Sequence, residues 1–76
     1  MIYFRPIPRK KWEKFLRHIG CEKTRQKSSH IFYRKPGLKR PIVFQADKEV
    51  APHIIKTNLE TLGVSFSDFL ETLEKI

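Results

Sequence analysis

A chain of 76 residues has room for one small domain, and we expect residues 1–76 to form it. The chain carries 16 Lys and Arg residues against 8 Asp and Glu residues, a formal net charge of +8. No apolar run approaches the ~20 residues of a membrane-spanning helix, the N-terminus lacks the apolar segment of a signal peptide, and Cys21 is the only cysteine. We therefore expect a cytoplasmic protein without membrane contact, an intramolecular disulfide or a metal site built from clustered cysteines.

The positive charge is concentrated in the first half of the chain. Residues 1–40 hold 13 Lys and Arg against two acids, or +11, whereas residues 41–76 hold three Lys against six acids, or −3. A basic half beside a mildly acidic half favours a surface that binds a polyanion, and nucleic acid above all. The alternative is a charge excess that only keeps the protein soluble.

The first expected element after an extended lead-in at residues 1–7 is an amphipathic helix. It starts near Pro8, whose fixed φ suits a first helical turn, and stops at Gly20. Its apolar stripe follows the i, i+3, i+4, i+7 spacing at Trp12, Phe15, Leu16 and Ile19.

Three strands then follow, at residues 21–27, 30–35 and 40–45. Ser28-Ser29 and Pro36-Gly37 supply the turns between them, which predicts a three-stranded antiparallel meander. Strict alternation would place the side chains of Cys21, Lys23, Arg25 and Lys27 on one face of the first strand. It would likewise place those of His30, Phe32 and Arg34 on one face of the second strand.

The second half of the chain is expected to be helical after a polar bridge at residues 47–51. One helix runs from Pro52 to Leu62, and a short C-terminal helix follows a cap at Ser65 or Ser67. The fold class is therefore α+β, with the order αβββα plus a C-terminal helix. By analogy, the double-stranded-RNA-binding domain has the same order of elements.

A chemical signal lies between residues 25 and 34. His30 can exchange a proton near neutral pH, and Arg25, Lys27 and Arg34 can hold a polyanion beside it. A phosphate ester next to a histidine is the minimum arrangement for cleaving RNA, whose 2′-hydroxyl is a built-in nucleophile. The alternatives are a strand histidine that is bonded to backbone and charges that only protect an edge strand.

Short motifs occur in order at Gly20, Arg25-Gln26-Lys27, Ser29-His30, Tyr33 and Pro36, and then at Glu49-Val50, Pro52, Leu59, Gly63, Ser65 and Phe69-Leu70. The ordered set, over roughly residues 8–74, resembles the HicA-type toxins of toxin–antitoxin pairs. In that family pattern a glycine precedes Ser-His, whereas this chain has Ser28. A positive φ at that position would strain a serine.

The resemblance implies a small toxin that cleaves mRNA with one essential histidine, here His30, and without a metal or other cofactor. It also implies an antitoxin of the HicB type that masks the site. We expect no DNA binding by this chain alone. A lone histidine cannot serve as base and acid at once, and Ser29 or Lys27 is a candidate for stabilising the phosphorane. The candidate RNA-binding residues are Arg25, Lys27, Ser29, Arg34, Lys10 and Lys14.

His18 lies on the flank of the first expected helix and His53 near the start of the second, and the absence of Cys, Asp or Glu at ligand spacing disfavours a metal site. His53 replaces a small residue of the family pattern and is interpreted as a surface or cap residue. Phe32 is a candidate both for stacking on a base and for the core. The alternative function is a non-catalytic RNA-binding module on the same fold. No helix-turn-helix spacing is evident, which disfavours a DNA-binding domain.

Overall fold

The computed structural model describes residues 5–76, so most of the predicted lead-in at residues 1–7 lies outside the described residues. The elements in chain order are β1 (Ile7–Pro8), α1 (Arg9–His18), β2 (Glu22–Lys27), β3 (His30–Arg34), β4 (Ile42–Gln45), β5 (Glu49–Val50), α2 (Pro52–Leu62) and α3 (Phe66–Lys75). None of the helices within residues 5–76 has the length and apolar character needed to span a membrane.

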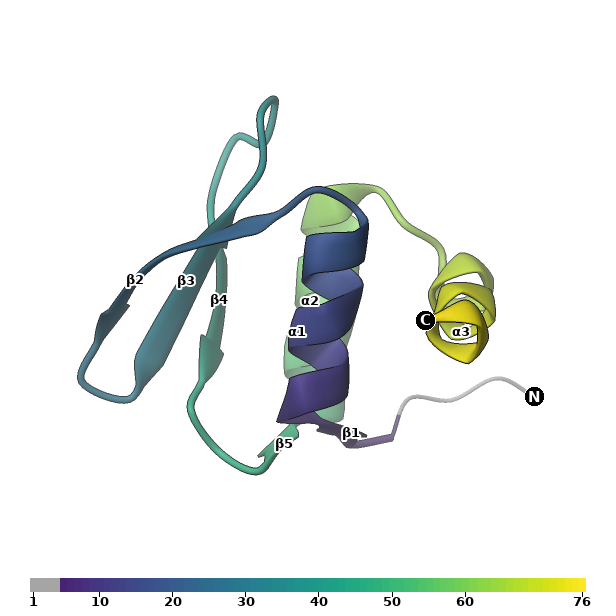
Figure 1. Cartoon of the computed structure of the whole chain (residues 1–76), viewed down its shortest axis with the longest axis horizontal. Coiled ribbons are helices and arrows are strands. Elements are labelled where there is room, and N and C mark those ends of the chain that lie inside the picture. The colour runs from purple at the N-terminus through teal and green to yellow at the C-terminus, as the bar shows by residue number, and fades with distance from the viewer. Residues whose placement is uncertain (1–4) are drawn as a thin grey trace.

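The strands β2, β3 and β4 form a three-stranded antiparallel sheet in that order. The helices α1 and α2 lie side by side next to this sheet, and α3 lies on their far side (Figure 1). Trp12, Phe15 and Phe69 join the helices through ring contacts, with Phe15 and Phe69 centroids 4.8 Å apart. The predicted α+β class, the three-stranded sheet and the C-terminal helix are confirmed.

The strand β3 alternates between the two faces of the sheet. Ile31 and Tyr33 are buried in the hydrophobic core that the helices share, whereas His30 and Arg34 are exposed and Phe32 is half-buried. We call the face that carries His30 the outer face. The predicted sharing of one face by His30, Phe32 and Arg34 is therefore confirmed, and it directs the candidate histidine away from the core.

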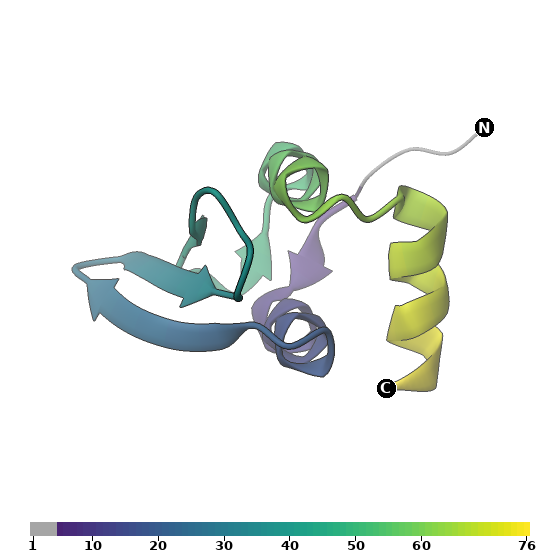
Figure 2. The ribbon, with the colours of Figure 1, turned by 90° about the horizontal axis from the view of Figure 1, so that it is seen from above.

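The strand β2 departs from the predicted alternation. A β-bulge lies between Lys23 and Arg25, so that Lys23 pairs with Tyr33 while Arg25 pairs with Phe32. Directly paired residues point to the same face, so Lys23 does not share a face with Arg25, and the prediction that it would was wrong. Every residue of β2 is exposed, because the β2–β3 hairpin extends beyond the helices (Figure 2).

The segment expected to be a polar bridge at residues 47–51 contains a strand. Ile7 pairs with Val50 in a two-stranded antiparallel sheet of β1 and β5, and the Arg9 N–H donates to the Lys48 carbonyl at 2.8 Å. Val50 is buried with the core. The strands have only two residues each, too few for a period-2 pattern to predict them. This pairing fixes the start of α1 beside the segment that leads into α2.

Within residues 5–76, Ser28 is the only non-glycine residue with a positive φ, at 57°. It is the first of the two turn residues between β2 and β3, a position where a positive φ favours glycine. We expect Ser28→Gly to raise the free energy of unfolding by about 0.5 to 1 kcal/mol, because it relieves a left-handed serine. Chemical denaturation measures this. Ser29→Gly is the matched control and should lower stability, since Ser29 lacks a positive φ. A loss of stability in both variants would contradict the assignment.

A buried phenol links the sheet to α1. The Tyr33 hydroxyl donates to Glu13 Oε1 at 2.5 Å, and Glu13 Oε2 lies 3.3 Å from Arg9 Nε. Burial first, and then the Glu13 carboxylate, raise the pKa of Tyr33 to about 12. The native state therefore holds the neutral phenol more firmly than the unfolded chain does.

The raised pKa of Tyr33 predicts a loss of stability in alkali. Its contribution is complete below the ordinary tyrosine pKa of about 10 and disappears as the pH rises toward 12. At about 1.4 kcal/mol per pH unit, the loss is on the order of 2 to 3 kcal/mol. Tyr33→Phe should lack this component, so that denaturation at pH 8 and near pH 12 gives a smaller difference than in the wild type. Parallel pH dependence in the two proteins would contradict the prediction.

Candidate functional site

His30 is the first residue of β3 and follows the Ser28-Ser29 turn directly. Its register partners are Lys27 on β2 and Gln45 on β4. Directly opposed residues in an antiparallel pair have Cβ atoms about 5 Å apart and share a face. The exposed imidazole therefore stands in one row between a lysine and a glutamine on the outer face, close to the tip of the hairpin.

Two of the predicted RNA-binding cations lie beside His30. Lys27 is its cross-strand partner, and Arg25 belongs to the next row of the outer face, with its guanidinium carbon 4.6 Å from the Phe32 ring centroid. This cation–π contact restricts the arginine and covers part of the ring. A base that stacks on Phe32 would thus have to displace Arg25 or stack on its guanidinium plane. Regular pairing from the two-residue turn, Lys27 with His30 and Arg25 with Phe32, is what places Arg25 and Lys27 on this face.

The remaining predicted RNA-binding residues are more widely spread. Ser29 lies in the turn, where its carbonyl accepts from the Ala46 N–H at 2.7 Å. Arg34 is on the outer face but four positions along β3, about 13 Å from His30 at ~3.3 Å per residue. Lys10 and Lys14 are exposed on α1, which packs against the opposite face of the sheet. The structure therefore does not bring Lys10 and Lys14 together with His30.

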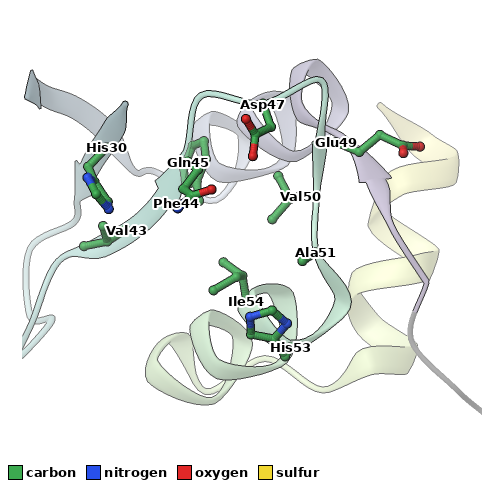
Figure 3. Close-up of a pocket in the computed structure, with 10 residues that line it drawn as sticks. All are labelled: His30, Val43, Phe44, Gln45, Asp47, Glu49, Val50, Ala51, His53 and Ile54. Atoms are coloured by element: carbon green, nitrogen blue, oxygen red, sulfur yellow. The ribbon is translucent and has the colours of Figure 1, made fainter. Parts of the chain in front are cut away.

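A pocket of about 510 Å³ opens between the edge strand β4 and the start of α2, and His30 is at one side of it (Figure 3). Its volume is in the range of ~300–1,000 Å³ that small ligands occupy. Apolar side chains and two carboxylates contribute to its lining, together with His53 on the first turn of α2. The lining residues are His30, Val43, Phe44, Gln45, Asp47, Glu49, Val50, Ala51, His53 and Ile54.

His53 was interpreted from sequence as a surface or cap residue, and it is indeed exposed. Its position in the same pocket as His30 was not predicted. Buried Asn58 donates through Nδ2 to the Val43 carbonyl at 3.2 Å and so ties α2 to β4. The signal for this contact was an asparagine in the apolar face of a helix, which indicates a specific buried partner but does not identify it.

No group of three or more His, Cys, Asp or Glu side chains in the described part of the chain is arranged to hold a metal ion. Cys21 is buried, and that burial raises the pKa of its thiol despite the opposing effect of Lys35. A protonated, buried thiol is a poor nucleophile.

A family model described as "HicA toxin of bacterial toxin-antitoxin" matches residues 9–64. The chain belongs to the HicA toxin family. The matched range runs from the start of α1 past the end of α2 and includes the turn, His30, Arg25 and Lys27. As a HicA toxin, the protein is the toxin component of a toxin–antitoxin system and has a cognate antitoxin as its partner. No curated protein and no solved structure matches the chain.

Proposed function

We propose that this HicA toxin is a metal-independent endoribonuclease that cleaves mRNA, with His30 as a general acid or base. The observation that carries the proposal is the exposed imidazole of His30 in a row with Lys27, one row from the stacked Arg25. The family is one of ribonuclease toxins, and a histidine is the side chain best suited to move protons near neutral pH.

The proposed reaction uses the RNA's own 2′-hydroxyl. The 2′-oxygen bonds to phosphorus while a base takes its proton, and the bond from phosphorus to the 5′-oxygen breaks as an acid donates a proton to that oxygen. Attacking and leaving oxygens lie roughly in line through phosphorus. Lys27 would stabilise the negative charge that develops on the non-bridging oxygens, a role supported by its facing the same side of the sheet as His30.

The proposal divides the cations between two surfaces. Arg25, Lys27 and Arg34, with Ser29 in the turn, would hold the phosphates on either side of the scissile bond. Lys10 and Lys14, on the helical side of the molecule, would contact only an RNA long enough to wrap around it. The binding of a short RNA should therefore depend on the residues of the outer face alone.

The test is cleavage of a defined mRNA by the purified toxin in the presence of EDTA. The expected products carry a 2′,3′-cyclic phosphate and a 5′-hydroxyl, because the nucleophile belongs to the RNA. A requirement for added divalent metal, or products with a 5′-phosphate, would overturn the proposal. Specific RNA binding without any cleavage would instead support the alternative function, a non-catalytic RNA-binding module.

RNA binding should weaken steeply as salt rises. Each neutralised phosphate of a single strand contributes about −0.7 to the slope of log affinity against log salt. Arg25→Ala should reduce the magnitude of that slope by about one such contact. Lys75→Ala on α3 removes a positive charge far along the chain from the outer face and serves as the control. Equal slopes for Arg25→Ala and Lys75→Ala would remove Arg25 from the RNA-binding surface.

The partner is proposed to be an antitoxin of the HicB type that covers the outer face around His30. A basic ribonuclease free in the cell would attack the host's own RNA. An acidic partner would complement the +11 charge of residues 1–40 and would be captured rapidly.

A further inference from the structure

Two imidazoles line one pocket from different secondary-structure elements. His30 stands at the start of β3, and His53 stands on the first turn of α2. Figure 3 shows the two rings at different walls of the pocket, with the strand on one side and the helix on the other. They are 23 positions apart in the chain and line the same pocket because α2 packs beside β4.

Cleavage through the 2′-hydroxyl needs two proton transfers on opposite sides of phosphorus. One group takes the proton of the 2′-hydroxyl, and another gives a proton to the 5′-oxygen, while the two oxygens lie roughly in line. A single imidazole on one side of the phosphate cannot perform both transfers in the same step. A second group that exchanges protons near neutral pH is therefore required on the far side.

We infer that His53 is that second group and that His30 and His53 divide the base and acid roles between them. The inference rests on the function proposed above. In the forward step one imidazole leaves as imidazolium with the proton of the 2′-hydroxyl, and the other leaves neutral after protonating the 5′-oxygen. Charge and protons balance, and no further reactant is needed.

The pocket has the size and lining that this role demands. About 510 Å³ accommodates one nucleotide unit with its scissile phosphate. Val43 and Ile54, both half-buried, offer an apolar wall to a ribose or a base between the two histidines. The phosphate would then lie toward Lys27, away from the carboxylates.

The position of His53 is fixed by its backbone and by the packing of α2, and its imidazole is exposed. The chain enters α2 through Pro52 at the first helical position, and the Asn58 bond to Val43 fixes the helix against β4. The Thr57 hydroxyl bonds only the backbone carbonyl of His53, at 2.9 Å. The imidazole itself is exposed at the pocket. Its replacement should therefore leave the fold intact.

Charged groups from several elements surround the pair. Asp47 precedes β5, Glu49 lies on it, Lys27 faces His30 from β2, and Lys56 follows His53 on α2. Because two carboxylates line the pocket, it does not resemble a phosphate-binding site formed by positively charged side chains alone. Two imidazoles at different walls of one pocket suit a reaction with two proton transfers better than simple binding.

The test compares His53→Ala and His53→Gln with His18→Ala, which removes an exposed histidine at the end of α1, outside this pocket. We expect both His53 variants to lose ~10²–10⁴-fold in cleavage rate at saturating RNA, as removal of a general acid or base does. His18→Ala should cleave like the wild type. All variants should share the thermal unfolding midpoint and the RNA affinity of the wild type.

A second substrate separates a catalytic from a structural loss. RNA with sulfur in place of the 5′-bridging oxygen has a leaving group that departs without a proton. We expect this substrate to restore cleavage in only one of the His30→Ala and His53→Ala variants, the one that lacks the acid. Restoration in neither or in both, or wild-type cleavage by His53→Ala, would overturn the inference while the ribonuclease function stands. If the wild type itself does not cleave RNA, the proposed function fails and the inference with it.

Discussion

His30→Ala is expected to lower RNA cleavage by ~10²–10⁴-fold while leaving the folded protein unchanged. The imidazole is exposed on the outer face, next to a two-residue turn, and packs against no part of the core. Removing the imidazole should therefore abolish its proton transfer and change the free energy of unfolding only slightly. In cells, expression of the variant should no longer arrest growth.

The measurement is single-turnover cleavage of a defined mRNA, with thermal unfolding and RNA affinity recorded on the same samples. His18→Ala is the matched control, because it removes an exposed histidine at the end of α1, outside the pocket that His30 lines. Wild-type cleavage by His30→Ala would remove His30 from the mechanism. A large loss of folded protein would instead indicate that the histidine supports the hairpin.

Co-expression with the cognate antitoxin is expected to give a stable complex in which cleavage is lost and His30 is hidden. The outer face presents Lys27 and Arg25 beside the imidazole and Arg34 at the other end of β3, so an acidic partner that binds there would block both the proposed phosphate contact and the proposed proton transfer. Electrostatic complementarity should make association fast and sensitive to salt.

Affinity purification through the small reading frame adjacent to the toxin gene tests this expectation. The toxin should co-purify, and alkylation of His30 in the complex should be slower than in the free toxin, whereas His18 should react equally in both. A toxin that does not co-purify, or that cleaves RNA at its full rate in the complex, would contradict the proposed masking. Protection of His18 with exposure of His30 would place the antitoxin on the helical side.

Local patterns in the sequence were sufficient for most elements. The i, i+3, i+4 spacing of Trp12, Phe15 and Leu16 predicted α1, and all three side chains are buried. Alternation in β3 correctly placed His30 on the face opposite Ile31 and Tyr33. These properties depend on neighbours within a few residues, which is why a periodic pattern can reveal them.

The bulge in β2 shows where such patterns fail. Strict alternation put Lys23 and Arg25 on one face. The partners of these two residues, Tyr33 and Phe32, are adjacent in β3, so β2 has one extra residue between Lys23 and Arg25 and the two side chains face opposite sides. The polar strand has no apolar face that would fix its register, so its composition gave no sign of the bulge. The two-residue strands β1 and β5 were missed because they are too short for any period.

By itself, the sequence determined the basic first half and the αβββα order with its C-terminal helix. It also determined that His30 begins a strand and points away from the core. Only the tertiary structure decided that Arg25 and Lys27 share the outer face with His30, that Lys10 and Lys14 do not, and that His53 lines the pocket of His30. The physical reason is that these relations join residues on different elements. They follow from how α2 packs on β4 and from the register in which β2 pairs with β3, and the packing depends on side chains distributed over the whole core.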